Sequence, residues 1–215
     1  GALEKVVRPS HVLWRCDSAM RELEGLDRYV EWAGDAGPET LTVQEAELTF
    51  QAPALTGQKT GWYFDHRDNR LRLRPYAKGA RVLDLFAGSG SVGFEALSRG
   101  AGRVTFVENS PKALEIIRRN LKMLRAGTEA RCVSTSAFVY GDLAGEDFIF
   151  VSPPYPQIER MSSLGRFMGP KASEGTWWIL QHPSGYALKG AENFWEPVET
   201  RDYGRNALTF FRKKG

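Results

Sequence analysis

Cysteine is scarce in this sequence, which contains only Cys16 and Cys132. Two cysteines so far apart exclude a disulfide framework and a cysteine metal cluster, and we expect both to be reduced, partly buried thiols. No apolar run approaches the length of a membrane span, and residues 1–20 lack the apolar core of a signal peptide. We therefore expect a cytoplasmic protein with no membrane partner.

Net charge is also low, at +3, and a value this small excludes no class of partner. The distribution is more informative, because basic residues gather in two stretches, 59–81 and 201–214. Such clusters suit a phosphate backbone, although a solvated basic helix face explains each of them equally well. With 42% hydrophobic and 26% charged residues, a chain of 215 residues can bury a large core.

Two sections are expected along the chain. Residues 1–57 predict a small α+β section, and residues 58–215 predict the main domain. The small section contains helical spacing over residues 18–32, and two alternating stretches, 40–45 and 47–52, that are typical of paired strands.

A glycine-rich turn is the most informative feature of the main domain. The apolar strand 82–87 runs into Gly88-Ser89-Gly90 and then into the helical stretch 94–98. Glycines at the carboxyl end of a strand let backbone N–H groups approach a nucleotide-type ligand. A glycine pattern alone is weak evidence. The following strand, however, ends in Glu108, at the spacing where an acidic side chain binds the hydroxyls of a ribose.

Asp84 and Phe86-Ala87 precede these glycines, and the whole motif resembles the first signature of class I S-adenosylmethionine-dependent methyltransferases. The resemblance implies S-adenosylmethionine as the cofactor, with the turn packed against its amino-acid end. It implies that Asp84 orders the loop and that Glu108, with the adjacent Asn109, binds the ribose. A strand-turn-helix without a ligand and a plain dehydrogenase are the alternatives.

Residues 58–70 mix aromatic and charged side chains just ahead of this turn. They resemble a segment of the large-subunit rRNA methyltransferases that make 5-methylcytosine or 7-methylguanine. In that family the segment covers the cofactor, which implies that four residues lie near the methyl donor: Thr60, Phe64, Asp65 and Arg67. A basic amphipathic helix over 64–76 is the alternative, since periodicity alone cannot choose.

Strands and helices alternate after the glycine turn. A helix is predicted over 111–125, because Ser110 can cap it and Pro111 suits its first position. Further strands are predicted at 130–133, 148–151 and 177–181, followed by an antiparallel hairpin of 198–203 with 207–212. The expected fold class is α/β, a Rossmann-like class I methyltransferase fold with a seven-stranded, mostly parallel sheet and an antiparallel last strand. Ser136-Ala137 occupies the turn that commonly faces the adenine ring of the cofactor in this fold.

The turn Ser152-Pro153-Pro154-Tyr155 directly follows the strand 148–151. It resembles the signature of methyltransferases that act on exocyclic amino groups. The resemblance implies that Ser152 Oγ and the Pro153 carbonyl accept hydrogen bonds from the amine while Tyr155 stacks on the base. Catalysis is then mostly positioning for in-line attack on the sulfonium methyl. Ser152 stands where an acidic residue is commoner, and it cannot neutralise the charge that develops on nitrogen.

The residues after the fifth predicted strand argue against covalent cytosine chemistry. That chemistry needs a thiolate, and the position where relatives carry it reads Gln181-His182-Pro183-Ser184. Residues 80–212 instead resemble the small-subunit rRNA guanine-N2 methyltransferases, in both turns and in the closing stretch 203–208. His182 is interpreted as a general base or, more commonly at such a position, as a hydrogen-bonded structural histidine.

The sequence therefore predicts an enzyme that transfers a methyl group from S-adenosylmethionine to an exocyclic amine of a base in RNA. Guanine N2 of ribosomal RNA is the favoured target, with ribosomal RNA or a pre-ribosomal particle as the partner. A DNA amino-methyltransferase and a catalytically silent RNA-binding protein that retains the fold are the alternatives. Oligomeric state does not follow from the sequence.

Overall fold

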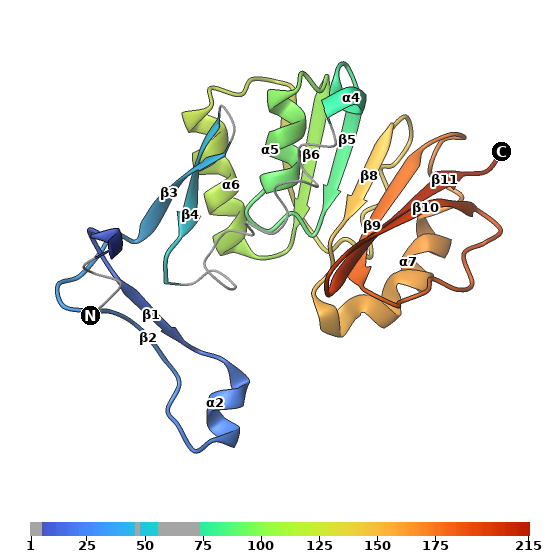
Figure 1. Cartoon of the computed structure of the whole chain (residues 1–215). Coiled ribbons are helices and arrows are strands. Elements are labelled where there is room, and N and C mark those ends of the chain that lie inside the picture. The colour runs from blue at the N-terminus through green and yellow to red at the C-terminus, as the bar shows by residue number, and fades with distance from the viewer. Residues whose placement is uncertain (1–5, 46–47, 56–73) are drawn as a thin grey trace. The chain divides into compact units, whose positions relative to one another are not determined.

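The computed structural model describes residues 6–45, 48–55 and 74–215 (Figure 1). The chain divides into two compact units, residues 1–65 and 66–215. The predicted boundary after residue 57 and the predicted cofactor residues Thr60, Phe64, Asp65 and Arg67 lie outside the described residues. None of the described helices combines the length and the hydropathy that a membrane crossing requires.

The described part of the first unit contains two antiparallel strand pairs. β1 (Leu13–Cys16) pairs with β2 (Tyr29–Trp32), and β3 (Thr40–Glu45) pairs with β4 (Leu48–Pro53). The second pair confirms the prediction from the alternating stretches.

The helix expected over residues 18–32 is wrong for most of its length. α2 (Ala19–Leu23) is only one turn long, because Gly25 follows in the left-handed region with φ of 71°. Residues 29–32 then form β2, where an aromatic and β-branched run pairs with β1. Long-range pairing has overridden the helical spacing.

A seven-stranded sheet forms the centre of the second unit, in the order β10-β11-β9-β8-β5-β6-β7. Its strands are β5 (Arg81–Leu85), β6 (Arg103–Glu108), β7 (Ala130–Ser134), β8 (Phe148–Val151), β9 (Trp177–Pro183), β10 (Trp195–Tyr203) and β11 (Asn206–Lys213). Neighbours from β7 to β9 pair in parallel, whereas β11 runs antiparallel to both β9 and β10. The predicted sheet with a reversed last strand is confirmed.

Helices pack on both faces of this sheet. α7 (Met161–Met168) buries Leu164 and Met168 in a core shared with Leu83 and Trp178. On the other face, Val92 of α5 (Ser91–Ser98) packs with Phe150 and neighbouring strand residues. The short elements are α4 (Arg74–Ala77) and the 3₁₀ helix η2 (Tyr155–Arg160). The central parallel strands are buried on both sides, which explains their continuous apolar sequences.

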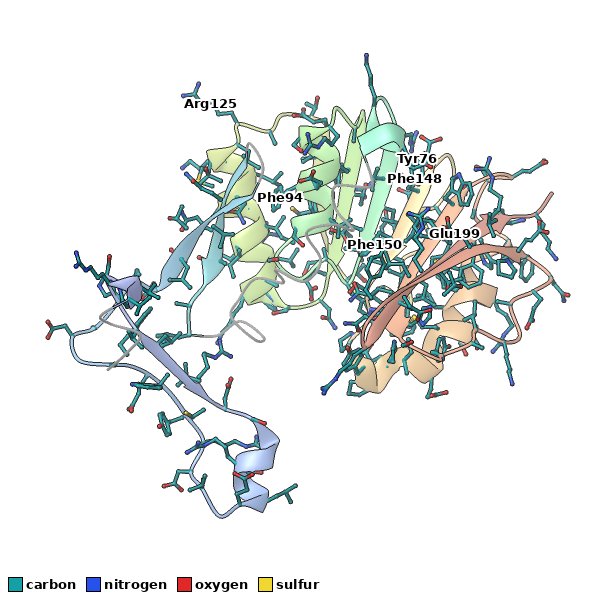
Figure 2. All side chains as sticks on the ribbon, viewed as in Figure 1. Tyr76, Phe94, Arg125, Phe148, Phe150 and Glu199 are labelled. Carbon is teal, nitrogen blue, oxygen red and sulfur yellow. The ribbon has the colours of Figure 1, made fainter. Side chains whose placement is uncertain are left out.

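α6 (Pro111–Met123) begins as predicted but ends earlier. Ser110 Oγ accepts a hydrogen bond from the Ala113 N–H at 3.4 Å, and Pro111 occupies the first turn. The helix stops before Arg125, labelled in Figure 2, because that residue takes a left-handed φ of 53°. The helix therefore ends at Met123 and not at the predicted residue 125.

Candidate functional site

The glycine turn leaves β5 through a series of left-handed residues, Phe86, Gly88 and Gly90, with φ of 59°, 55° and 80°. The Gly90 N–H closes the turn on the Ala87 carbonyl at 2.7 Å. A Cβ on Gly90 would lie 2.7 Å from the Phe94 ring, so only glycine fits there. Among the described residues, a Cβ on Gly88 would meet only the Phe86 carbonyl, at 3.9 Å. The described part of the chain therefore leaves space for a ligand in front of Gly88.

Asp84 ties the strand to the helix that follows the turn. Its side chain is 2% exposed, and Oδ2 accepts a hydrogen bond from the Gly93 N–H at 3.1 Å. The pKa of Asp84 is raised to about 8, chiefly by burial. The charge of Glu108 contributes to this rise, and the Gly93 hydrogen bond opposes it. Gly93 permits the approach, because a Cβ there would lie 2.2 Å from the Phe106 ring.

Glu108 holds the turn from the end of β6. Its Oε2 accepts from the Gly88 N–H at 2.8 Å, and its Oε1 accepts from the Asn109 and Ser110 N–H groups at 2.9 and 2.8 Å. The carboxylate thus links the glycine turn to the start of α6. The side chain is only partly buried, so the same group stands at the surface of the turn where the ribose was expected.

The turn after β7 brings two further aromatic contacts to this region. Ser136 Oγ accepts from the Phe138 N–H at 3.3 Å, and Ala137 is buried. The ring of Phe138 lies edge-on to that of Phe86, with centroids 5.5 Å apart. The guanidinium of Arg160 lies 3.6 Å from the Phe138 centroid. Sequence reasoning singled out Ser136-Ala137 but missed Phe138 and Arg160.

The Ser-Pro-Pro-Tyr turn leaves the sheet beside the glycine turn. Leu85 and Val151, the last residues of β5 and β8, are register partners, and the Ser152 N–H lies 3.5 Å from the Leu85 carbonyl oxygen. Pro153 is buried and Pro154 exposed, and η2 begins at Tyr155. The structure therefore brings the predicted cofactor turn and the predicted target turn to one edge of the sheet.

Both polar side chains of the target turn are held by strands further along the sheet. Ser152 Oγ donates a hydrogen bond to Gln181 Oε1 of β9 at 3.1 Å. The Tyr155 hydroxyl donates to Asn206 Oδ1, at the start of β11, at 2.5 Å. Tyr155 is still 58% exposed, which leaves its ring available for a base. Gln181 and Asn206 were present in the quoted motifs, but only the strand pairing reveals these contacts.

His182 is built into the sheet. Its Nδ1 lies 2.9 Å from the Pro183 carbonyl and its Nε2 lies 2.7 Å from Thr209 Oγ1, which also contacts Thr200 Oγ1 at 2.8 Å. The Pro183 carbonyl can only accept, so Nδ1 carries a proton there, and Nε2 is bonded to the Thr209 hydroxyl. With both ring nitrogens engaged and 3% exposure, the geometry supports the structural interpretation over a general base.

The cysteines lie where a catalytic nucleophile is not expected. Cys132 belongs to β7 and Cys16 to β1, and both are free and partly buried, as predicted. Burial raises the pKa of the Cys132 thiol, which disfavours the nucleophilic thiolate.

An apolar hollow lies on a sheet face rather than at the site edge. Figure 2 shows Tyr76, Phe148 and Phe150 gathered beside Glu199, and Trp177 and Phe210 complete much of the lining. Glu199 is already engaged by Arg201 through two hydrogen bonds. The hollow is therefore lined mainly by apolar side chains, and its two charged residues are paired with each other.

The fold and the two turns define the class I methyltransferase fold, and comparisons with known proteins agree. The model of the family described as "Conserved hypothetical protein 95" matches residues 70–212, and the chain belongs to this family. "Ribosomal RNA large subunit methyltransferase I" of Escherichia coli K12 is 31% identical over 170 residues. That match covers 76% of this chain but only 43% of the relative, and it confirms the resemblance to rRNA methyltransferases.

Solved structures support the fold. A candidate methylase from Haemophilus influenzae superposes with a TM-score of 0.61 at 25% identity, covering 70% of this chain and 98% of that one. A candidate S-adenosylmethionine-dependent methyltransferase from Streptococcus mutans superposes with a TM-score of 0.72 at 16% identity, covering 85% and 58%. The second likeness shows the fold alone.

Proposed function

We propose that this chain is an S-adenosylmethionine-dependent RNA methyltransferase that modifies an exocyclic amine, with guanine N2 of ribosomal RNA as the target. One observation carries the proposal: Leu85 and Val151 are register partners, so the glycine turn and the Ser-Pro-Pro-Tyr turn leave the sheet together. Ligands of open α/β sheets bind at the carboxyl ends of the strands. A donor held by one turn would therefore face an acceptor held by the other.

The described residues fit the cofactor. Gly88 is open on its ligand side, Glu108 stands at the surface of the turn, and Asn109 follows it. We assign the amino-acid end of the cofactor to Gly88-Ser89-Gly90 and the ribose to Glu108 and Asn109. The adenine belongs beside Ser136-Ala137, with Asp84, Phe86 and Ala87 shaping the turn. Thr60, Phe64, Asp65 and Arg67 remain proposed contacts from the upstream segment.

The target turn suits an amine whose two N–H groups are held so that the nitrogen becomes pyramidal. Ser152 Oγ and the Pro153 carbonyl would accept the two N–H groups, and the exposed ring of Tyr155 would stack on the base. Bound S-adenosylmethionine supplies an electrophilic methyl group, so that a C–N bond forms as the C–S bond breaks and the methylated amine releases a proton to water. The protein's contribution is alignment, because none of the residues at the turn is needed as a covalent nucleophile.

Two features support RNA and the amine over other targets. The relative from Escherichia coli is named as a ribosomal RNA methyltransferase. Cytosine-C5 chemistry would need a cysteine near the end of β9, where Gln181 and His182 stand instead. Gln181 is already hydrogen-bonded to Ser152, and His182 to Thr209. These observations favour ribosomal RNA as the partner and an amino group as the acceptor.

The test is methyl transfer from tritium-labelled S-adenosylmethionine to unmodified small- and large-subunit rRNA transcribed in vitro. Digestion to nucleosides should place the label in N2-methylguanosine. Label in 5-methylcytidine or 7-methylguanosine would contradict guanine N2 as the target. Transfer to DNA but not to RNA would contradict RNA as the partner. No transfer to any nucleic acid, with the cofactor still bound, would favour a silent binding protein.

A further inference from the structure

The hydroxyl of Ser152 has a defined hydrogen-bond polarity. A serine hydroxyl carries one proton and two lone pairs, so it can either donate to a substrate or accept from it. Here Ser152 Oγ donates its proton to Gln181 Oε1 at 3.1 Å, and both side chains are partly buried. With its one proton committed inside the protein, Oγ can offer only lone pairs to a molecule that approaches the turn.

We propose that Gln181 is a positioning residue that makes Ser152 an obligate hydrogen-bond acceptor, and thereby selects an N–H donor as the group to be methylated. This inference rests on the proposed function and deepens it by assigning the selection of the amine. An unfixed hydroxyl could rotate and donate to a carbonyl oxygen or a ring nitrogen of the base. Such a contact would bind the wrong edge and leave the amine out of line.

The backbone places Gln181 for this role. Val151 of β8 and Leu180 of β9 are parallel register partners, so Ser152 and Gln181 follow at adjacent positions. Gln181 itself pairs with Leu208 of β11, which fixes its strand from the other side. A group held by two neighbouring strands keeps its direction better than one on a loop.

A second contact shows the same design at the other end of the turn. Asn206 pairs with Pro183 in the β9–β11 ladder, and its side chain accepts the proton of the Tyr155 hydroxyl. Each of the two polar side chains of the turn therefore donates its proton to a side-chain amide on β9 or β11. The turn presents a stacking ring and acceptor atoms to the base, and neither hydroxyl proton.

The identity of residue 152 explains why this chain needs the hydrogen bond to Gln181. An ionised aspartate accepts hydrogen bonds in every orientation, so the acidic residue that is commoner at this position needs no partner to set its polarity. A serine hydroxyl is neutral and can either donate or accept a hydrogen bond. The role predicts that Gln181 matters when residue 152 is serine and matters little when it is aspartate.

The experiment is a double-mutant cycle between the two positions. Gln181→Met keeps the length of the side chain and removes the acceptor, Gln181→Glu keeps an acceptor, and Ser152→Asp is combined with Gln181→Met. The readouts are kcat and KM for transfer from tritium-labelled S-adenosylmethionine to unmodified rRNA, the Kd of S-adenosylhomocysteine by titration calorimetry, and the melting temperature.

We expect Gln181→Met to lower kcat about tenfold, the effect of losing one oriented hydrogen bond in the transition state, with the KM for the cofactor unchanged. Gln181→Glu should keep kcat within about threefold of the unsubstituted chain, and in the Ser152→Asp background Gln181→Met should cost less than about twofold.

Equal losses from Gln181→Met in the serine and aspartate backgrounds would overturn the role, because they would show a merely structural contact. The role would also be overturned if Gln181→Glu lowered kcat as much as Gln181→Met. This comparison can be made even if Ser152→Asp is inactive. If the unsubstituted chain methylates RNA and Gln181→Met has no effect, the inference alone fails. If the unsubstituted chain binds the cofactor and methylates nothing, the proposed function fails and takes this role with it.

Discussion

Leu85 and Val151 are register partners at the carboxyl ends of β5 and β8. The two turns that carry the site begin at the next residue of each strand. The Ser152 N–H lies 3.5 Å from the Leu85 carbonyl oxygen. The two turns are therefore still side by side at their first residues. In the proposed function, this neighbourhood would bring a methyl donor and its acceptor together at one edge of the sheet.

Asp84→Asn tests the buried carboxyl. The pKa of Asp84 is raised by burial from its ordinary value of 3.8 to about 8, so the folded chain keeps a proton that the unfolded chain releases. The stabilisation is full below the unfolded pKa and is lost as pH rises through the folded one. Between about pH 5 and pH 7, the free energy of unfolding of the parent should fall by about 1.4 kcal/mol per pH unit relative to Asp84→Asn. Urea titrations at several pH values measure the free energy of unfolding of both chains. Profiles that stay parallel over this pH range would contradict the prediction.

Glu108→Ala removes the acceptor of three backbone N–H groups at the glycine turn. We expect it to lower the free energy of unfolding by about 2 kcal/mol, since partly buried donors lose their partner. The affinity for S-adenosylhomocysteine, measured by calorimetry, should fall more than about tenfold because the ribose contact is lost as well. Glu115→Ala is the matched control, because Glu115 is an exposed residue that forms a surface ion pair with Arg119. Unchanged cofactor affinity in Glu108→Ala would contradict the ribose assignment.

Gly93→Ala tests the close packing of α5 on the sheet. The new Cβ would lie 2.2 Å from the Phe106 ring, so the helix start must shift. Overpacking of this kind costs about 1–3 kcal/mol of unfolding free energy, and the displaced Gly93 N–H would also weaken its bond to Asp84. Gly141→Ala is the control, because its Cβ would meet the flexible Lys171 side chain at 3.4 Å and the Phe167 ring at 3.9 Å, both ordinary contacts. Equal melting temperatures for the two variants would show that Gly93 is not a packing constraint.

Arg160→Ala tests the guanidinium that stacks on Phe138 beside the site. Arg160 ends η2, the helix that begins with Tyr155, and its exposed cation suits a phosphate next to the target base. We expect weaker binding of unmodified rRNA and a log–log salt dependence whose slope is reduced by about 1. Arg119→Ala on α6 should leave both unchanged. The idea fails if Arg160→Ala keeps the slope of the parent chain.

The sequence predicted the second unit well because its signals are local. The apolar run 148–151 is a buried strand, Ser110 and Pro111 begin α6, and Gly90 takes the positive φ expected of a tight turn. These features depend on neighbouring residues. The same kind of local reasoning was wrong for residues 18–32, where the pairing of β2 with β1 overrode the helical spacing.

The contacts that support the target turn were beyond local reasoning. Ser152 and Gln181 are 29 positions apart, and Tyr155 and Asn206 are 51 apart. Gln181 looks like one polar residue in an apolar strand until the β8–β9 register places it beside Ser152. Glu108 shows an intermediate case. Its position was predicted from spacing, but its hydrogen bond to the Gly88 N–H required the structure.

The most direct test of the central claim is a crystal structure of the chain with S-adenosylhomocysteine and a short guanosine-containing RNA. The account predicts the sulfur of the cofactor product beside Gly88, and the exocyclic amine of the base between that sulfur and Ser152, with Tyr155 stacked on the ring. A cofactor product seated away from the glycine turn, or a base that reaches the sulfur without touching Ser152 or Tyr155, would contradict it.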